Sequence, residues 1–588
     1  MNQNVAFDRL DLNDDALRRA MRQSRSGLIA VALASAVINM LYLTSSLFML
    51  QVYDRVIPSQ SIPTLVALSL LALCLYLFQG AFEIVRSRML TRISGLFDEA
   101  AGTLVFEAAV KAPVRAGSGN GGLLLMRDFD RVKAFLSSTG LPAFFDLPWL
   151  PFYIAICFLF HPLIGIVAIA GAIVLIVLTY LTHVSAQRSA NELSKVARER
   201  DALLAAAHRN AGVVEAMGMG HDLAASWSQL NSRYRHIHRK GADGANVYAT
   251  SSKIFRIALQ SAVLALGAVL VINNQASGGI IIAASILLSR SLAPAEQAIA
   301  NWQGFVLSLQ SWRRLRPALL DGAKRTAPLA LPRPEKTFSV NALFSGPPDQ
   351  SCAIIANVSF TLKSGDAVAV IGPSASGKSS LARALTGIWP IRSGSVRLDN
   401  AALDQWSDTD RGNHIGYLPQ EIELFDGTVA QNIARFRTDA HACSIIEAAT
   451  TAGVHDMILK LTNGYETEIG PGGSALSAGQ RQRIALARAL FGNPFLIVLD
   501  EPNSNLDADG EVALSDAIRR IRERGAIVVV IAHRASALNS VDLVLMMMDG
   551  RVAAFGPKTE IMPKISRRSP PRDISRLSPL KVASEAGQ

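Results

Sequence analysis

The fold of the C-terminal half of this chain is decided by the stretch Ala367-Val368-Ala369-Val370-Ile371-Gly372-Pro373-Ser374-Ala375-Ser376-Gly377-Lys378-Ser379. The five apolar residues at its start predict a short buried strand. The glycine-rich loop Gly372–Ser379 follows, and residues 380–385 have a helical pattern. In this order the glycines let backbone N–H groups converge on phosphates, and the helix N-terminus adds the positive end of its dipole. The stretch therefore predicts a nucleotide site on an α/β fold.

Two side chains of this loop have the chemistry to bind phosphate and metal directly. Lys378 is expected to reach the β- and γ-phosphates, and the hydroxyl of Ser379 is expected to bind Mg²⁺. ATP and Mg²⁺ are therefore the expected cofactors. The residues expected to bind nucleotide through this loop are Gly372, Pro373, Ser374, Ala375, Ser376, Gly377, Lys378, Ser379 and Ser380.

An acidic pair ends a second predicted buried strand, Phe495–Leu499. Asp500 is placed to hold the Mg²⁺ shell, and Glu501 is placed to polarise the attacking water. Phosphoryl transfer needs mainly positioning and charge neutralisation, so these few groups suffice for ATP hydrolysis. The alternative is a solvent-exposed acidic pair after a strand, and the order of the motifs along the chain argues against it. We therefore expect Lys378 and Glu501 to be catalytic, with Ser379 and Asp500 as metal ligands.

The N-terminal half is rich in apolar segments of membrane length. The 588 residues are 50% hydrophobic and 18% charged, against about a quarter charged in ordinary soluble domains. Six segments come near the roughly 20 residues needed to cross a bilayer. They lie at about 27–50, 62–85, 145–160, 163–184, 252–273 and 277–298. The sequence therefore predicts an all-α membrane domain of six helices ahead of the α/β domain.

The distribution of basic residues predicts the topology. The net charge of +11 also fits a nucleic-acid binder, but the basic residues fall mostly between apolar segments, where the positive-inside rule places them. The stretches 86–133 and 188–253 are basic, whereas the short loops between apolar segments carry only Asp54 and Arg55 as charges. We therefore expect a multi-pass protein of the lipid bilayer with both termini in the cytoplasm, and no nucleic-acid partner.

Composition divides the chain into five parts. They are a polar cytoplasmic segment over 1–25, a transmembrane domain over 26–316, a linker over 317–336, a nucleotide-binding domain over 337–564 and a disordered tail over 565–588. The two basic stretches favour helix, and we expect them to extend the membrane helices into the cytosol. The four cysteines are isolated and show neither a metal-ligand spacing nor a disulfide framework.

The segment Leu476-Ser477-Ala478-Gly479-Gln480 resembles the signature of ABC-transporter ATPases. By that resemblance Ser477 and Gly479 cap the γ-phosphate of an ATP held by the opposite subunit, with Gln480 beside them in the binding set. The chain is therefore expected to act as a homodimer. The resemblance implies three further residues. Gln420 senses Mg²⁺ and binds the metal shell, and Asp507 lies in a loop that crosses the dimer interface. His533 is a catalytic histidine that contacts the γ-phosphate.

Three positions depart from that family's pattern. Ala478 stands where glycine is usual, and we expect the added Cβ to be tolerated. The region that normally supplies an aromatic residue for stacking on adenine has no tyrosine, and Phe344 is the aromatic residue present. The segment Gly470–Gly473 lacks the glutamate that many exporters use for contact with the membrane domain.

Segments of the membrane half narrow the resemblance. Phe145–Pro151, Phe160–Gly165 and Ser289–Glu296 resemble type I secretion ABC transporters, in the branch that exports proteases and lipases. The implied pump lies in the inner membrane of a Gram-negative bacterium and moves an unfolded polypeptide with a C-terminal signal. Its implied partners are a periplasmic membrane-fusion adaptor and an outer-membrane TolC-like channel. An exporter of lipid or small molecules stays open as the alternative, because it shares every motor motif. A non-hydrolysing ABC protein is a second alternative, against which Glu501 argues.

Arg290 lies within the sixth predicted span, where a charge is costly and usually faces a bundle interior or a cavity. One hypothesis is that Arg290 lines the polypeptide path. The alternatives are a buried ion pair or a side chain that snorkels towards the cytosol. Glu296 is six residues away on a different helix face, so we do not expect it to be the partner.

Overall fold

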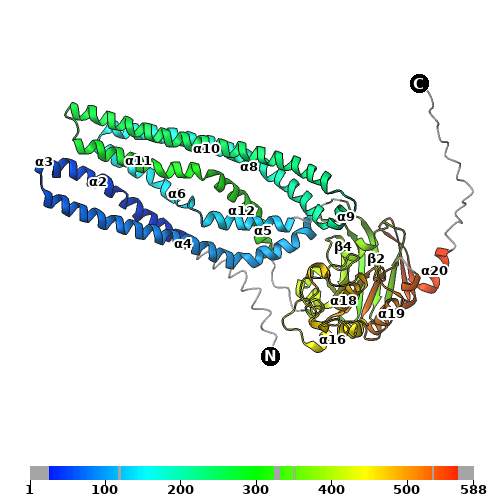
Figure 1. Ribbon diagram of the computed structural model, residues 1–588. Coiled ribbons are helices and arrows are strands. Elements are labelled where there is room, and N and C mark those ends of the chain that lie inside the picture. The colour runs from blue at the N-terminus through cyan, green and yellow to red at the C-terminus, as the bar shows by residue number, and fades with distance from the viewer. Residues whose placement is uncertain are drawn as a thin grey trace, which may run out of the picture. The chain divides into compact units, whose positions relative to one another are not determined.

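Figure 1 shows the computed structural model of the chain, which describes residues 26–116, 121–323, 331–348, 350, 352–532 and 535–566. Three sequence-based expectations lie outside the described residues, namely the segment 1–25, His533 and the tail beyond residue 566. The chain divides into two compact units near residue 325. The first unit is helical, and the second mixes helices with strands.

Within the described part of the first unit, six helical segments are long and apolar enough to cross a membrane. They are Ser26–Ser59, Ile62–Ala112, Leu141–Phe160, Pro162–Arg209, Gly220–Ile272 and Gly278–Ala300. The elements of this unit are α2 (Leu43–Gln51), η1 (Val52–Val56), α3 (Ile57–Ser59), α4 (Ile62–Ala116), α5 (Gly121–Leu136), α6 (Leu141–Asp146), η2 (Leu147–Trp149), α7 (Leu150–Phe160), α8 (Pro162–Arg209), α9 (Ala211–Ala216), α10 (Gly220–Ile272), α11 (Gly278–Ala300) and α12 (Trp302–Ala323).

Three of these helices are much longer than a bilayer is thick. Helices α4, α8 and α10 hold 55, 48 and 53 residues, which at 1.5 Å per residue is roughly 70–80 Å, against about 30 Å for the hydrocarbon core. The expected extensions beyond the membrane are therefore present on these helices. The third span has no such continuous extension, because the chain breaks between α5 and α6 at Gly140 and Pro142, and a proline donates no helical hydrogen bond.

Packing within the first unit is uneven. Helix α8 runs along α10, and α11 packs on α10, α2 and α7. The interior between them is filled by buried side chains that include Tyr153, Leu287 and Leu292. Helix α4 differs, since only 6% of its apolar, membrane-length stretch is buried within the protein, and Leu77 is 68% exposed. Its apolar surface therefore requires lipid or another protein surface.

The linker expected over 317–336 begins later than predicted. Helix α12 continues through Pro317 to Ala323. Leu315 and Leu319 are buried against Phe129 of α5, and this packing holds the helix together across the proline. Residues 331–336 are irregular, as expected of a linker.

The second unit contains two sheets. Its strands are β1 (Thr337–Ser345), β2 (Ile355–Lys363), β3 (Ala367–Ile371), β4 (Ile391–Leu398), β5 (Ala401–Ala402), β6 (Ile415–Leu418), β7 (Leu496–Asp500), β8 (Ile527–Ile531), β9 (Leu543–Met548) and β10 (Arg551–Pro557). One sheet has the order β2-β1-β4-β5 and is antiparallel, and the other has the order β10-β9-β3-β8-β7-β6.

The helices of the second unit flank these sheets. They are α13 (Lys378–Leu385), α14 (Asp408–His414), α15 (Val429–Ile433), α16 (Ala442–Thr451), α17 (His455–Leu459), α18 (Ala478–Leu490), α19 (Ala508–Glu523) and α20 (Lys558–Ser566), with 3-10 turns η3 (Leu403–Gln405), η4 (Gly464–Glu466), η5 (Pro471–Gly473) and η6 (Ala535–Ser540). The predicted architecture, a membrane domain of six long apolar helices followed by an α/β domain, agrees with these elements.

Strands β9, β3, β8, β7 and β6 of the larger sheet run parallel, and β6 lies at its edge. Alternate residues of β3 enter two different cores, because successive side chains of a strand point to opposite faces. Ala367 and Ala369 pack with α18, whereas Val368 and Val370 pack with β1 and α13. Parallel strands end at the same edge of a sheet, so the loops after β3, β7 and β6 meet there.

Candidate nucleotide-binding site

The loop between β3 and α13 is shaped by glycine. Gly372 needs to be glycine because a Cβ there would overlap the carbonyl oxygen of Met547. Gly377 has φ +94° immediately before α13 begins at Lys378, a conformation that glycine adopts at little cost. The hydroxyl of Ser376 is buried and has no hydrogen-bond partner among the described residues. A phosphate oxygen would satisfy this orphaned hydroxyl, so the loop fits the predicted ligand.

Lys378 lies folded over this loop. Its ammonium donates to the carbonyl oxygens of Gly372 at 3.0 Å and Pro373 at 2.8 Å, and the residue is 5% exposed. Burial lowers the pKa of Lys378, while the negative charges of Glu501 and Asp500 act in the opposite direction. The lysine is therefore placed where the loop carbonyls and the two acidic residues surround it.

Ser379 lies next to Asp500, the first residue of the acidic pair. Ser379 Oγ donates to Asp500 Oδ1 at 3.2 Å, which joins the start of α13 to the end of β7. Asp500 is 2% exposed. Glu501 follows with φ +52°, and its N–H donates to the carbonyl of Ile531 at 3.2 Å. A left-handed conformation in a non-glycine residue costs about 1–3 kcal/mol and is commonly found at functional sites.

Gln482 lies two residues after the signature segment and was given no role from the sequence. It lies on α18 and is 1% exposed. Its amide donates to the carbonyl of Pro502, and its Oε1 accepts from the N–H of Asn505 at 3.0 Å. It therefore fixes the loop that leaves Glu501. The sequence signal was a polar residue on the buried face of α18, in register with Ala485 and Ala489 at helical spacing.

The signature segment forms the start of α18. Ser477 caps this helix, since its Oγ accepts from Gln480 N at 3.2 Å and Gln480 Oε1 accepts from Ser477 N at 2.9 Å. This reciprocal pair is a capping box. Ala478 is the first helical residue and does not need a left-handed conformation, which explains why its Cβ fits. A Cβ at Gly479 would lie 3.1 Å from the carbonyl oxygen of Asn505.

Asp507 caps the next helix, α19. It accepts from Gly510 N at 2.9 Å and pairs with Arg483 of α18, a second residue that was given no role from the sequence. The backbone N–H of Gly510 and the Arg483 guanidinium hold the pKa of Asp507 below its ordinary value. The loop between Glu501 and α19 is thus tied to α18 through Gln482 and Arg483.

Gln420 follows β6 by two residues. It lines a cavity of about 620 Å³ together with Tyr417, Phe425 and Arg488.

The structure places Lys378, Ser379, Asp500 and Glu501 in one cluster. Ser477, Gly479, Gln480 and Asp507 form a second group around α18, and Gln420 lies at the cavity.

Comparisons with known proteins agree with this geometry. The family model described as ABC transporter transmembrane region matches residues 28–292, and the one described as ABC transporter matches residues 355–504. Type I secretion system ATP-binding protein PrsD of Rhizobium meliloti (strain 1021) is 57% identical over 566 residues, which cover 96% of this chain and 97% of that protein.

Two other relatives are similar to this chain at lower identity. Cyclolysin secretion/processing ATP-binding protein CyaB of Bordetella pertussis is 27% identical over 532 residues, covering 90% of this chain and 74% of that protein. Leukotoxin export ATP-binding protein LtxB of Aggregatibacter actinomycetemcomitans is 26% identical, with coverages of 92% and 77%. A bacterial Atm1-family ABC exporter solved with ATP bound has the same fold, with a TM-score of 0.78 at 20% identity and coverages of 92% and 96%.

Proposed function

This chain belongs to the ABC transporters of type I secretion, and we propose that it hydrolyses ATP to move an unfolded polypeptide with a C-terminal signal out of the cytoplasm. The observation that carries the proposal is the cluster of Lys378, Ser379, Asp500 and Glu501 at one sheet edge, in a chain that also holds six membrane-length helices. The named relatives, which secrete or export polypeptides according to their names, support the choice of substrate class.

The residues of the cluster divide the chemistry among them. Lys378 would exchange its two carbonyl hydrogen bonds for oxygens of the β- and γ-phosphates, and Ser376 would donate its unpartnered hydroxyl. Glu501 would accept a proton from the attacking water. Its fixed backbone would hold the carboxylate in position for this step. Mg²⁺, when bound, supplies charge neutralisation. Ser379, Asp500 and Gln420 are the residues proposed to hold it.

A second copy of the chain would complete each site. Ser477 is exposed, and its capping box with Gln480 keeps the start of α18 rigid. We assign to Ser477 and Gly479 the contact with nucleotide held by the other copy, and to Asp507 a position at the interface. Closed two-fold symmetry is the commonest way to satisfy such reciprocal sites, and His533 is proposed to contact the γ-phosphate.

The membrane unit places the protein in the bacterial inner membrane as a multi-pass protein. We propose that both termini are cytoplasmic, because the basic stretches 86–133 and 188–253 would then lie inside. A periplasmic membrane-fusion adaptor and an outer-membrane channel are the proposed partners, since the type I secretion relatives act in such systems.

The test compares proteins in the culture medium of cells that carry the wild-type chain or the Glu501→Gln variant. We expect one polypeptide to be missing from the medium of the variant. Loss of a lipid or a small molecule from the medium, with unchanged secreted proteins, would show instead that the cargo is not a polypeptide. Secretion by the variant at the wild-type level would overturn the role of hydrolysis.

A further inference from the structure

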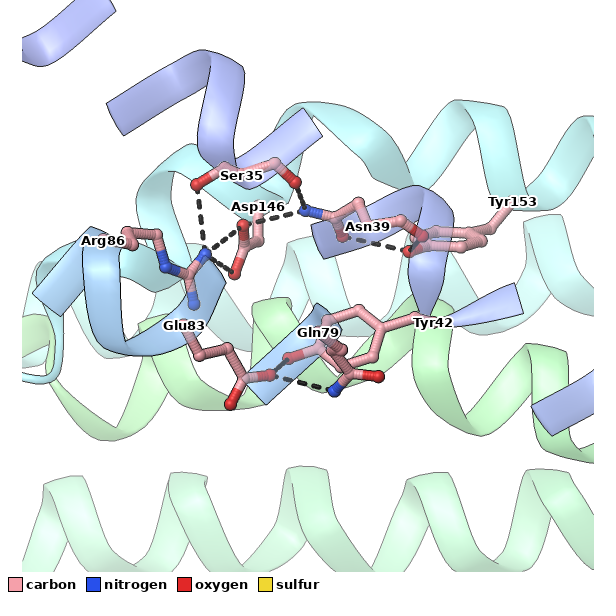
Figure 2. A network of polar contacts seen from close by, with 8 residues as sticks. All are labelled: Ser35, Asn39, Tyr42, Gln79, Glu83, Arg86, Asp146 and Tyr153. Atoms are coloured by element: carbon pink, nitrogen blue, oxygen red, sulfur yellow. Dashed lines mark hydrogen bonds and ion pairs between the residues drawn. The ribbon is translucent and has the colours of Figure 1, made fainter. Parts of the chain in front are cut away.

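A network of polar side chains lies inside the membrane unit, where the first three spans meet (Figure 2). It has two parts. The inner part consists of Ser35, Asn39, Arg86, Asp146 and Tyr153, which are all less than 10% exposed. The outer part consists of Tyr42, Gln79 and Glu83, which are half-buried.

The residues of the inner part form hydrogen bonds with one another. Arg86 Nη1 donates to both oxygens of Asp146, at 2.9 and 3.0 Å, and to Ser35 Oγ at 3.0 Å. Asn39 Nδ2 donates to Asp146 Oδ1 at 2.8 Å, and Tyr153 donates to Asn39 O at 2.7 Å. A paired and hydrogen-bonded cluster of this kind can remain buried in a membrane protein. It fixes the first span against α4, and therefore fixes Tyr42 beside Glu83.

The outer part keeps unused hydrogen-bonding capacity. Glu83 Oε1 accepts from Tyr42 at 3.1 Å and from Gln79 at 2.9 Å. The other oxygen of Glu83 has no hydrogen bond among the described residues, and it points away from the network in Figure 2. The Arg290 guanidinium of α11 lies 5.1 Å from the centre of the Tyr42 ring, and Arg290 is exposed.

These groups cannot face lipid at low cost. Glu83 and Arg290 lie within the predicted spans 62–85 and 277–298, and ionisable side chains at such positions face the bundle interior or a water-filled cavity. Glu296 does not neutralise Arg290, because Glu296 pairs with Arg256 of α10 at 2.6 Å. The patch formed by Tyr42, Gln79, Glu83 and Arg290 therefore marks the hydrated side of these helices.

Resting on the proposed function, we propose that this patch binds the backbone of the polypeptide during export. An unfolded chain presents an N–H and a C=O at every residue whatever its side chains are. The free carboxylate oxygen of Glu83 can accept from such N–H groups, while Gln79 and Arg290 can donate to the carbonyls. One acidic and one basic group balance each other, so cargo segments of either charge are tolerated. A lipid would instead require a largely apolar pocket.

The test places a photo-cross-linking amino acid at position 79 of the full-length chain, with position 77 as the matched control. Leu77 is apolar and 68% exposed, and it lies on the other side of α4 from Gln79, because two residues turn a helix by about 200°. The probe is the polypeptide identified from the culture medium, fused to a fast-folding domain that stalls its export. We expect an adduct with the probe from position 79 and none from position 77. If the variant at 79 does not accumulate, position 290 replaces it.

The other outcomes all overturn the proposal. Equal adducts from both positions would show contact without selectivity. An adduct between two copies of the transporter would make the patch a dimer contact. No adduct at 79 or 290, while the probe still stalls in the transporter, would place the path elsewhere and leave polypeptide export standing. Failure to find any transporter-dependent polypeptide would instead overturn the proposed function itself.

Discussion

Replacing Asp146 by asparagine should destabilise the membrane unit strongly, although the side chain keeps its size. The carboxylate of Asp146 is the counter-charge of Arg86, and the two residues are 6% and 8% exposed. Asparagine leaves the guanidinium buried without a compensating charge. Removing one partner of a buried ion pair costs about 3–5 kcal/mol. Each kcal/mol shifts Tm by about 2–4 °C in domains of 150–250 residues and by less in larger ones, so we expect Tm to fall by several degrees.

The assay is thermal unfolding of the purified full-length protein in detergent, followed by tryptophan fluorescence. The matched control is Asp98→Asn, because Asp98 pairs with Lys133 at 2.8 Å but its side chain is 51% exposed, and an exposed pair contributes about 0–1 kcal/mol. The double variant with leucine at positions 86 and 146 should melt above Asp146→Asn, since it contains no unpaired charge. Equal Tm values for Asp146→Asn and Asp98→Asn would refute the reasoning.

Four further predictions concern the nucleotide site, the fold and the membrane path. Glu501→Gln should retain ATP binding but slow phosphate release by roughly 10²–10⁴-fold, the usual contribution of a general base; unchanged release would contradict its assigned role. Gly372→Ala should weaken equilibrium ATP binding, because the new Cβ meets the Met547 carbonyl, and full binding would show that the loop can relax. Burial raises the pKa of Asp399, but the N–H groups of residues 335–337 outweigh it and hold the pKa below the ordinary 3.8. This carboxylate therefore stabilises the fold above about pH 4, and the Tm advantage of wild type over Asp399→Asn should shrink on acidification. Arg290→Ala should reduce secretion measured in the culture medium more than Arg290→Lys does, and normal secretion with normal ATPase activity would end its assignment to the polypeptide path.

The parts of the fold that the sequence predicts well are those set by local pattern. Strands β3 and β7 are short apolar runs, and each leads directly into residues of the nucleotide site. Because parallel strands end at the same edge of a sheet, the proximity of Lys378 and Asp500 could be predicted. The membrane helices are recognisable because every residue of a span must be compatible with lipid. Their extensions were expected from composition, and three of them are continuous helices.

The parts that escaped prediction depend on residues far apart in the chain. Gln482 holds the loop after Glu501 across about 20 residues, and Arg86 meets Asp146 across 60. No local pattern shows which polar residue of a helix will find such a partner. The end of α12 was misplaced for a related reason: Pro317 is a helix breaker by local rules, whereas the burial of Leu315 and Leu319 decides the outcome.

The poorly buried helix α4 has a consequence for the membrane that surrounds the protein. Between Ile62 and Phe82 it has 21 residues without a charge, which at 1.5 Å per residue is about 32 Å. This length matches an acyl-chain layer of about 30 Å. Because lipid or a neighbouring surface must cover this helix, a thinner or thicker bilayer would force it to tilt or would deform the lipid around it. Glu83 follows directly after that stretch, so a thicker bilayer would bring acyl chains to the level of a charged residue that should face the hydrated side of these helices.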